Sequence, residues 1–247
     1  MSAASQSLID ELRERIRRLE RCPARREGFL PSGRPEVDAL LSGGGFPRGA
    51  LAHLVGGPAS GKTLLSLSTL ATAAAEGGLA AFVDGRSELY PPAAEAVGLD
   101  LRRLLVVRPR RTSPAARGAR GAGRGEEALA GLWAAEALLG SGAFAAVAVD
   151  VPLRGLVSAR AEAMLRRLAA AAEKGGAVGL WLGASAPGCR VPAAVRLDLP
   201  GVAAGVADGR MPSPLMAPAE REGPLPEGEG RLFPVGVRKG SAGGGRV

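Results

Sequence analysis

The chain has 247 residues, of which 46% are hydrophobic, and a formal net charge of +8 at pH 7. This length suits one α/β domain with extensions, and no run reaches the ~18–20 apolar residues that a membrane span needs. Two cysteines, Cys22 and Cys189, and one histidine, His53, leave no basis for a disulfide framework, a histidine-ligated metal site or a Ser–His triad.

The chain begins with a predicted amphipathic helix. Apolar side chains recur at helical spacing over residues 7–21, namely at Leu8, Leu12, Ile16 and Leu19. Pro23 ends the pattern. We therefore assign residues 1–26 to an N-terminal helical arm. Its apolar stripe packs either on its own domain or on a second copy or a partner protein, and the second alternative would produce a homo-oligomer.

Residues 27–200 alternate between apolar strands and helices. The expected helices are 34–41, 62–76, 92–97, 126–139 and 158–173, and the expected strands are 51–55, 79–84, 104–108, 145–150, 177–182 and 194–199. Continuous apolar strands that alternate with helices are typical of a parallel sheet buried on both faces. The pattern predicts an α/β core with a mostly parallel sheet flanked by helices.

Two segments do not fit this alternation. Residues 108–125 are rich in Arg, Gly and Pro, and residues 201–230 are rich in Pro, Gly and other small residues. Neither composition can build a core, so we expect both to be mobile. Residues 201–247 then form a flexible tail with one candidate strand at 231–238, where Pro234 favours the edge of a sheet.

One motif predicts nucleotide binding. The pattern G-x-x-x-x-G-K-[ST] is matched by Gly56, Gly57, Pro58, Ala59, Ser60, Gly61, Lys62 and Thr63. Glycines let successive backbone N–H groups point at phosphate oxygens, and the following helix adds the positive end of its dipole. Lys62 would reach the β- and γ-phosphates of ATP, and the Thr63 hydroxyl would ligate Mg²⁺.

A second element of such a site is an acid at the end of a neighbouring strand. Asp150 ends the apolar run FAAVAVD and is the candidate that would hold Mg²⁺ together with Thr63. Asp84 ends another predicted strand and could lie in the same crevice, because open α/β sheets bind ligands at the carboxyl ends of their strands.

The positive charge suggests a polyanionic partner. A strip of arginines without aromatic residues predicts weak binding to DNA without sequence preference, through Arg108, Arg110, Arg111, Arg117, Arg120 and Arg124. The alternative is that arginine is simply the preferred basic residue of this chain, which has three lysines, Lys62, Lys174 and Lys239. In that case the strip serves solubility.

A family resemblance rests on a longer stretch. The run LPSGRPEVDALLSGGGFPRGALAHLVGGPASGKT, followed by a helix and a strand that ends in Asp84, resembles the start of the bacterial recombinase RecA. VGLDLRRLLVVRP and AAVRLDL are similar to other RecA segments, so the likeness covers residues 29–199. It implies a RecA-like core that binds ATP with Mg²⁺.

The departures from RecA concern catalysis and DNA. The resemblance places Arg86 where RecA-type ATPases have a catalytic Glu, and Glu88 is the one carboxylate nearby that could replace it. The adenine-stacking tyrosine corresponds to Ala93, and the glutamine that senses the γ-phosphate corresponds to Gly183. The two segments that match the DNA-binding loops are short. The resemblance thus implies an ATP binder with at most slow ATPase activity.

This profile is similar to the ImuA family of RecA-like accessory proteins, through the GGG-x-P lead-in and the segment from Pro91 to Pro109. The likeness implies a role in the SOS response to DNA damage and in mutagenic translesion synthesis. Its partners would be an ImuB-like protein and an error-prone polymerase, or RecA, in a cytoplasmic, nucleoid-associated location. Two alternatives stay open: a recombinase filament on single-stranded DNA, and a small-molecule P-loop kinase with residues 108–125 as its lid.

Overall fold

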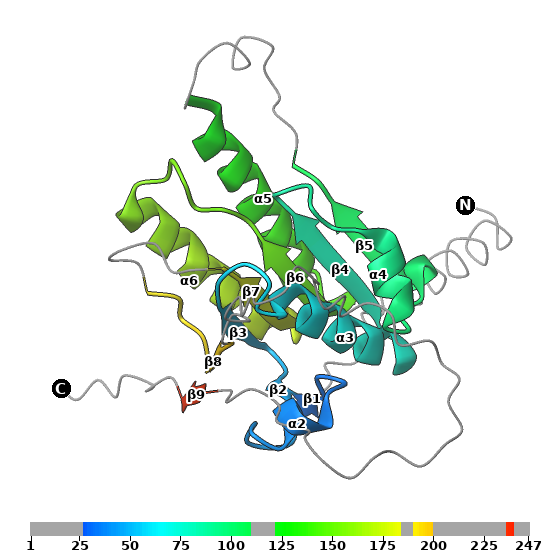
Figure 1. The fold of residues 1–247 in the computed structure, drawn as a ribbon. Coiled ribbons are helices and arrows are strands. Elements are labelled where there is room, and N and C mark those ends of the chain that lie inside the picture. The colour runs from blue at the N-terminus through cyan, green and yellow to red at the C-terminus, as the bar shows by residue number, and fades with distance from the viewer. Residues whose placement is uncertain (1–26, 110–121, 184–189, 200–235, 240–247) are drawn as a thin grey trace, which may run out of the picture.

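Six short strands run parallel in the central sheet (Figure 1). The computed structural model describes residues 27–109, 122–183, 190–199 and 236–239. The parallel strands are β3 (Ala50–Val55), β4 (Leu79–Asp84), β5 (Leu104–Val107), β6 (Phe144–Asp150), β7 (Val178–Leu182) and β8 (Val195–Asp198). The order across the sheet is β5-β4-β6-β7-β3-β8-β9. The prediction of a mostly parallel α/β sheet is confirmed.

The last strand of the sheet runs against the others. β9 (Gly236–Lys239) pairs antiparallel with β8, with Val195 opposite Lys239 and Asp198 opposite Gly236. It lies at the edge of the sheet and overlaps the candidate strand at 231–238 only in its last residues, because it begins after Pro234.

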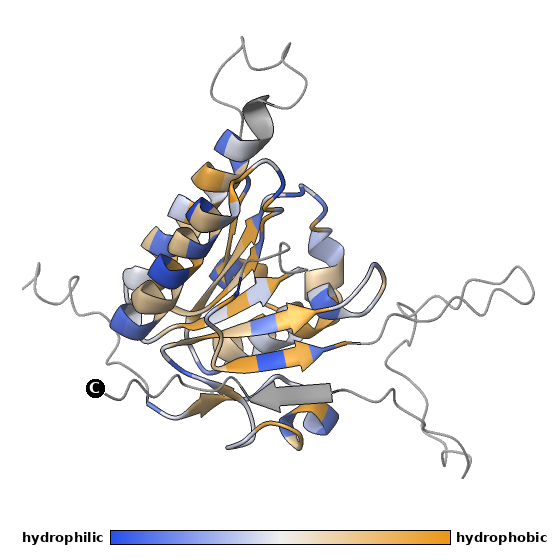
Figure 2. Cartoon of the chain, turned by 90° about the vertical axis from the view of Figure 1, so that its left-hand side faces the viewer, coloured by the Kyte–Doolittle hydropathy of each residue, from blue (hydrophilic) through white to orange (hydrophobic). Residues whose placement is uncertain are grey.

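Helices cover both faces of the sheet. α3 (Lys62–Ala75) and α4 (Pro91–Ala96) pack on one face, and α5 (Ala122–Gly140) and α6 (Ser158–Gly175) pack on the other (Figure 1). Two hydrophobic clusters result, one on each side of the sheet. Figure 2 shows that hydrophobic residues dominate the strands of the sheet. Both faces are therefore buried at the centre of the sheet, which explains why β4, β6 and β7 are continuously apolar up to their last residues rather than alternating.

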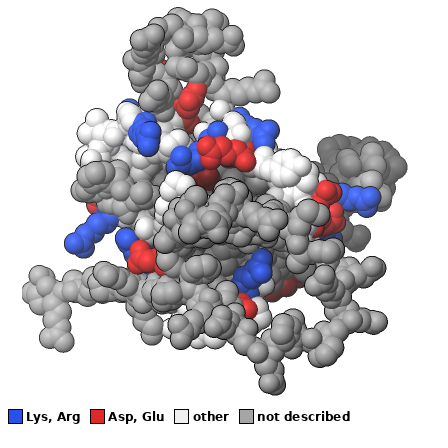
Figure 3. All heavy atoms as spheres, in the orientation of Figure 1, with Lys and Arg blue, Asp and Glu red and all other residues white. Residues whose placement is uncertain are grey.

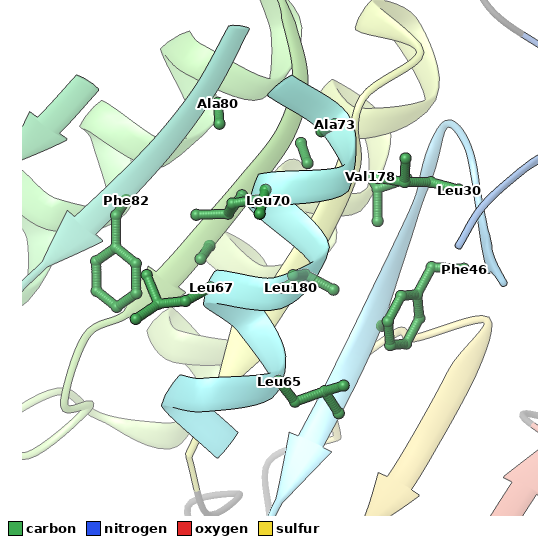
Figure 4. Close-up of a cluster of buried hydrophobic side chains, with 14 of the residues drawn as sticks. Leu30, Phe46, Leu65, Leu67, Leu70, Ala73, Ala80, Phe82, Val178 and Leu180 are labelled. Carbon is green, nitrogen blue, oxygen red and sulfur yellow. The ribbon is translucent and has the colours of Figure 1, made fainter. Parts of the chain in front are cut away.

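The helix after β3 is the centre of one cluster (Figure 4). Leu67, Leu70 and Ala73 are at most 2% exposed and face the sheet. Burial of one leucine side chain contributes ~1.5–3 kcal/mol. The hydroxyl of buried Thr69 donates to the Leu65 carbonyl one turn earlier, so this polar group is buried at little cost.

A small two-stranded unit precedes the sheet, and the sequence analysis did not predict it. β1 (Phe29–Leu30) pairs antiparallel with β2 (Phe46–Pro47), and α2 (Pro35–Asp38) lies between them in the chain. Leu30 and Phe46 are fully buried against the α3 side of the core. α2 is shorter than the helix predicted over 34–41. β1 and β2 could not be predicted because two residues are too few to show the alternation of apolar and polar side chains that marks a strand.

Several predicted segments lie outside the described residues. These are the helical arm at 1–26, the arginine-rich residues 110–121 and all of the tail 201–247 except β9.

A 3-10 turn, η1 (Leu101–Arg103), precedes β5. In the part of the chain that the structure describes, no helix has the length and apolar character needed to cross a membrane.

Candidate nucleotide-binding site

The loop 56–61 connects β3 to α3 at the carboxyl edge of the sheet. Gly61 is the N-cap of α3, has φ +82°, and leaves the helix without a side-chain cap. A left-handed backbone angle favours glycine, and the uncapped first turn presents its N–H groups outward. No described atom lies within 4 Å of a side chain built at Gly57 or Gly61. The space over this loop can therefore accept a phosphate group at a helix N-terminus.

Lys62 extends back over the loop. Its Nζ donates to the carbonyl oxygens of Gly56 at 2.8 Å and Gly57 at 2.6 Å, and to the Ser60 hydroxyl at 3.0 Å. The ammonium thus satisfies its three donors on oxygens of the loop. Burial lowers its pKa, and the Arg86 charge lowers it further, while the Asp150 charge raises it. The exposed Thr63 follows Lys62 in the first turn of α3.

Asp150 ends β6 and is paired with an arginine. Its Oδ1 accepts a hydrogen bond from Arg86 Nε at 2.7 Å, and the Asp150 side chain is 14% exposed against 38% for Arg86. Burial raises the pKa of Asp150, and the Arg86 hydrogen bond and charge oppose that rise. The acid predicted to bind Mg²⁺ therefore already has a positively charged partner.

Asp84 lies directly opposite Asp150, because the two residues are in register across β4 and β6. Its side chain is 1% exposed and accepts hydrogen bonds from the Glu88 N–H at 3.0 Å, the Leu89 N–H at 3.2 Å and Arg108 Nε at 2.9 Å. Asp84 therefore holds the loop after β4 in place. The sequence predicted that Asp84 ends a strand, but it did not indicate this structural role.

The loop after β4 also positions two charged residues. The Gly85 N–H donates to the Asp150 carbonyl at 2.9 Å, and Ser87 has φ +58°. Arg86 therefore faces Asp150, whereas the Glu88 side chain is exposed. The Glu88 charge contributes to raising the Asp150 pKa. The role of Glu88 as a catalytic carboxylate stays a prediction.

Three other positions named in the sequence analysis, His53, Gly183 and Ala93, have structural roles. His53 is 2% exposed, and its Nε2 donates to the Gly183 carbonyl at 2.8 Å. This agrees with a packed, hydrogen-bonded histidine. Gly183 has φ +140°, a backbone angle that a side chain rarely adopts, so glycine is suited to this position after β7. Ala93 lies in α4 and packs against the α3 side of the core.

The site fits the phosphates better than it fits a metal ion. The open loop, the uncapped helix and Lys62 are the groups that a triphosphate needs. Of the two predicted metal ligands, Thr63 is exposed but Asp150 is bound to Arg86. Within the described ranges, no three His, Cys, Asp or Glu side chains gather in a way that could hold a metal ion.

The predicted DNA-binding arginines are only partly described. Arg108 donates to buried Asp84 and, through Nη2, to the Leu89 carbonyl at 3.0 Å, so it has a structural role. Residues 110–121 lie outside the described residues, and Arg124 lies in the first turns of α5. Figure 3 shows basic and acidic side chains interspersed over the described part of one face. Of the arginines predicted to bind DNA, those between 110 and 121 lie outside the described residues, so the predicted strip stays a prediction.

A shallow hollow lies elsewhere, between the C-terminal ends of α5 and α6. Its volume is about 650 Å³, and Trp133, Glu136 and Arg167 are among the residues that line it. Helices that connect parallel strands run opposite to them, so this hollow is at the amino edge of the sheet, away from the loop 56–61. It does not belong to the candidate nucleotide site.

Comparisons with known proteins agree with this site. The family model for the RecA N-terminal domain matches residues 13–151, more than half of the chain, including the phosphate loop and Asp150. Protein RecA of Lactobacillus delbrueckii subsp. bulgaricus is 36% identical over 121 residues, 49% of this chain and 32% of the relative. Protein RecA of Symbiobacterium thermophilum is 38% identical over 121 residues, again 49% of this chain and 30% of the relative. The matched region is thus about a third of these relatives' length.

Proposed function

Because the chain belongs to the RecA N-terminal domain family, we propose that it is an ATP-binding accessory protein of the DNA damage response. It acts in error-prone translesion synthesis, mainly through contacts with partner proteins and only weakly through DNA. A RecA-like P-loop domain generally binds ATP with Mg²⁺. The finer role rests on the resemblance to the ImuA family and on how the site departs from that of a working ATPase.

ATP binding is supported by the loop between β3 and α3. The backbone of Gly56 to Gly61 and the N-terminus of α3 would hold the phosphates, and Lys62 would exchange its loop carbonyls for phosphate oxygens. Magnesium, when it accompanies ATP, neutralises phosphate charge. Thr63 is the residue placed to hold it.

The single observation that supports an accessory role is the ion pair between Arg86 and Asp150 beside this loop. An arginine stays charged at any physiological pH and cannot accept a proton from water. A site with a cation at this point holds ATP but activates water poorly. ATP is then a ligand that stabilises one state of the protein, rather than a substrate in rapid turnover.

The likeness to ImuA includes a defined part of the fold. The segment from Pro91 to Pro109 forms α4, η1 and β5, which make up one edge of the sheet. Leu99 of this segment is 2% exposed and belongs to the core, so the likeness covers an integral part of the domain. We propose an ImuB-like protein, an error-prone polymerase or RecA as the partner.

Nucleotide binding is tested by titrating the full chain with a fluorescent ATP analogue. We expect saturable binding that weakens at least tenfold in Lys62→Ala, because a hydrogen bond to a charged group contributes ~1.5–3 kcal/mol. Lys174→Ala, an exposed lysine at the end of α6, is the matched control and should bind normally. Absence of binding to the unaltered chain would remove the ATP-binding proposal.

The accessory role is tested by gel filtration with purified candidates. We expect co-elution with an ImuB-like protein of the same organism, and a small species rather than a filament with single-stranded DNA and ATP. A long, ATP-dependent filament on DNA would instead favour the recombinase. If the chain co-elutes with none of the three candidate partners (the ImuB-like protein, the error-prone polymerase and RecA), the proposed role is contradicted, but the proposed ATP binding is not.

A further inference from the structure

The strand-end carboxylate of the nucleotide site has a counter-ion within the chain. Asp150 is largely buried, and a buried carboxylate needs a partner of opposite charge. Arg86 supplies it with a hydrogen bond of 2.7 Å to Oδ1. In a P-loop site this carboxylate ordinarily faces a divalent cation. Here a guanidinium is in contact with it.

Backbone contacts hold Arg86 in place. The buried Asp84 accepts hydrogen bonds from the N–H groups of Glu88 and Leu89, which closes the loop after β4. At the other end of the loop, the Gly85 N–H donates to the Asp150 carbonyl. The loop is therefore anchored on both sides of Arg86, so the backbone that carries Arg86 is held beside Asp150 while its partly exposed side chain makes the ion pair.

The same cation belongs to the charge cluster around the phosphate loop. The charges of Arg86 and Asp150 both influence the pKa of Lys62, in opposite directions. A triphosphate on the loop would therefore bind in the electrostatic field of two cations of the chain, Lys62 and Arg86. A divalent ion at Asp150 would have to displace Arg86 or share the carboxylate with it, and either arrangement places like charges together.

We propose that Arg86 takes the place of Mg²⁺ at Asp150, so that this site binds nucleotide with little dependence on divalent cations. The proposal rests on the proposed ATP binding and concerns its metal requirement. Asp150 is then a positioning residue for Arg86 rather than a metal ligand. Magnesium bound to ATP in solution would contact the site through Thr63 alone.

The test compares nucleotide affinity with and without Mg²⁺ in the full chain. A fluorescent ATP analogue is titrated in buffer with Mg²⁺ and in buffer with EDTA. We expect the two dissociation constants of the unaltered protein to agree within about threefold. In Arg86→Ala, where Asp150 loses its counter-ion, we expect binding at least tenfold weaker in EDTA than in Mg²⁺.

Two further variants separate this effect from a general change in charge. Arg166→Ala removes an exposed arginine paired with Glu162 on α6 and should leave the affinity ratio as in the unaltered protein. Asp150→Asn in the Arg86→Ala background should remove the metal dependence that Arg86→Ala creates, because the carboxylate ligand is gone.

The outcomes distinguish this inference from the proposed function. If the unaltered chain binds nucleotide in Mg²⁺ but at least tenfold more weakly in EDTA, the inference is wrong and ATP binding stands. If Arg86→Ala stays independent of metal, or loses binding under both conditions, Arg86 does not replace the metal. If the unaltered chain binds no nucleotide under either condition, the proposed ATP binding fails and the inference with it.

Discussion

The ends of β4 and β6 differ although both end in an aspartate and lie in register. Asp84 is buried and accepts three hydrogen bonds, from two backbone N–H groups and Arg108. Asp150 is more exposed and accepts one, from Arg86. The Asp84 carboxylate therefore holds the loop after β4 in place. The Asp150 carboxylate is paired with Arg86, whose side chain is accessible to solvent and to a ligand.

The difference shows that an aspartate at the end of an apolar strand can have either of two roles, holding a loop or facing a ligand site. An aspartate after an apolar strand marks the carboxyl edge of the sheet, and both residues obey that rule. What each then does depends on the loop that follows β4, because that loop supplies donors to Asp84 and a guanidinium to Asp150. Experiments that alter the two ends separately can therefore test their division of roles.

The largest expected effect concerns ATP hydrolysis. Without a carboxylate to orient and polarise water, turnover should be ~10²–10⁴-fold below that of a site with a working general base. We expect Arg86→Glu to raise hydrolysis, measured as phosphate release in Mg²⁺, because it places an acid at that point of the loop.

The opposing hypothesis assigns the base to Glu88, whose N–H donates to Asp84 and whose side chain is exposed on the loop after β4. It predicts brisk turnover in the unaltered chain that disappears in Glu88→Ala. That result would overturn the role proposed here for the β6 end and make the protein a competent ATPase.

The next effect concerns stability in the absence of nucleotide. Asp84→Asn should lower the free energy of unfolding by about 2–3 kcal/mol, because buried donors lose a charged acceptor. Asp150→Asn should change it by about 1 kcal/mol or less, since Arg86 is partly exposed and can turn to solvent. Urea unfolding of the two variants measures both changes in the free energy of unfolding. Equal losses in the two variants would contradict the different roles assigned to Asp84 and Asp150.

The sequence predicted the sheet well because buried parallel strands and the helices between them have clear periods. It also predicts the phosphate loop, since Gly56, Gly61 and Lys62 match the backbone geometry and charge that such loops share. It did not reveal the pairing of Arg86 with Asp150 or of Arg108 with Asp84. Those contacts join residues 64 and 24 positions apart, and only the folded sheet brings them together.

A third prediction separates Arg108 from the arginines that follow it. Because Arg108 is bound to Asp84 and Leu89, Arg108→Ala should destabilise the fold without changing how DNA binding depends on salt. Replacing Arg110, Arg111, Arg117 and Arg120 by Ala should flatten the log–log salt slope for single-stranded DNA by up to about 3 units, at ~0.7 per phosphate. An unchanged slope would assign these four arginines to solubility.

The smallest expected effect comes from His53, which joins β3 to the end of β7 through a hydrogen bond. Burial lowers the pKa of His53, although its hydrogen bond to the Gly183 carbonyl opposes that shift. The unfolded chain therefore takes up a proton near the ordinary pKa of ~6.5 while the folded chain resists it. Stability that is fully present above that pH should be lost as the pH falls toward the folded-state pKa.

The slope of this loss is at most ~1.4 kcal/mol per pH unit for one proton. Urea unfolding between pH 7.5 and 5.5 measures it, with His53→Gln as the matched variant whose amide can still donate to Gly183. Because His53 is the one histidine of the chain, the variant should lose most of the slope in this range. If both proteins keep the same slope, titration elsewhere governs acid stability.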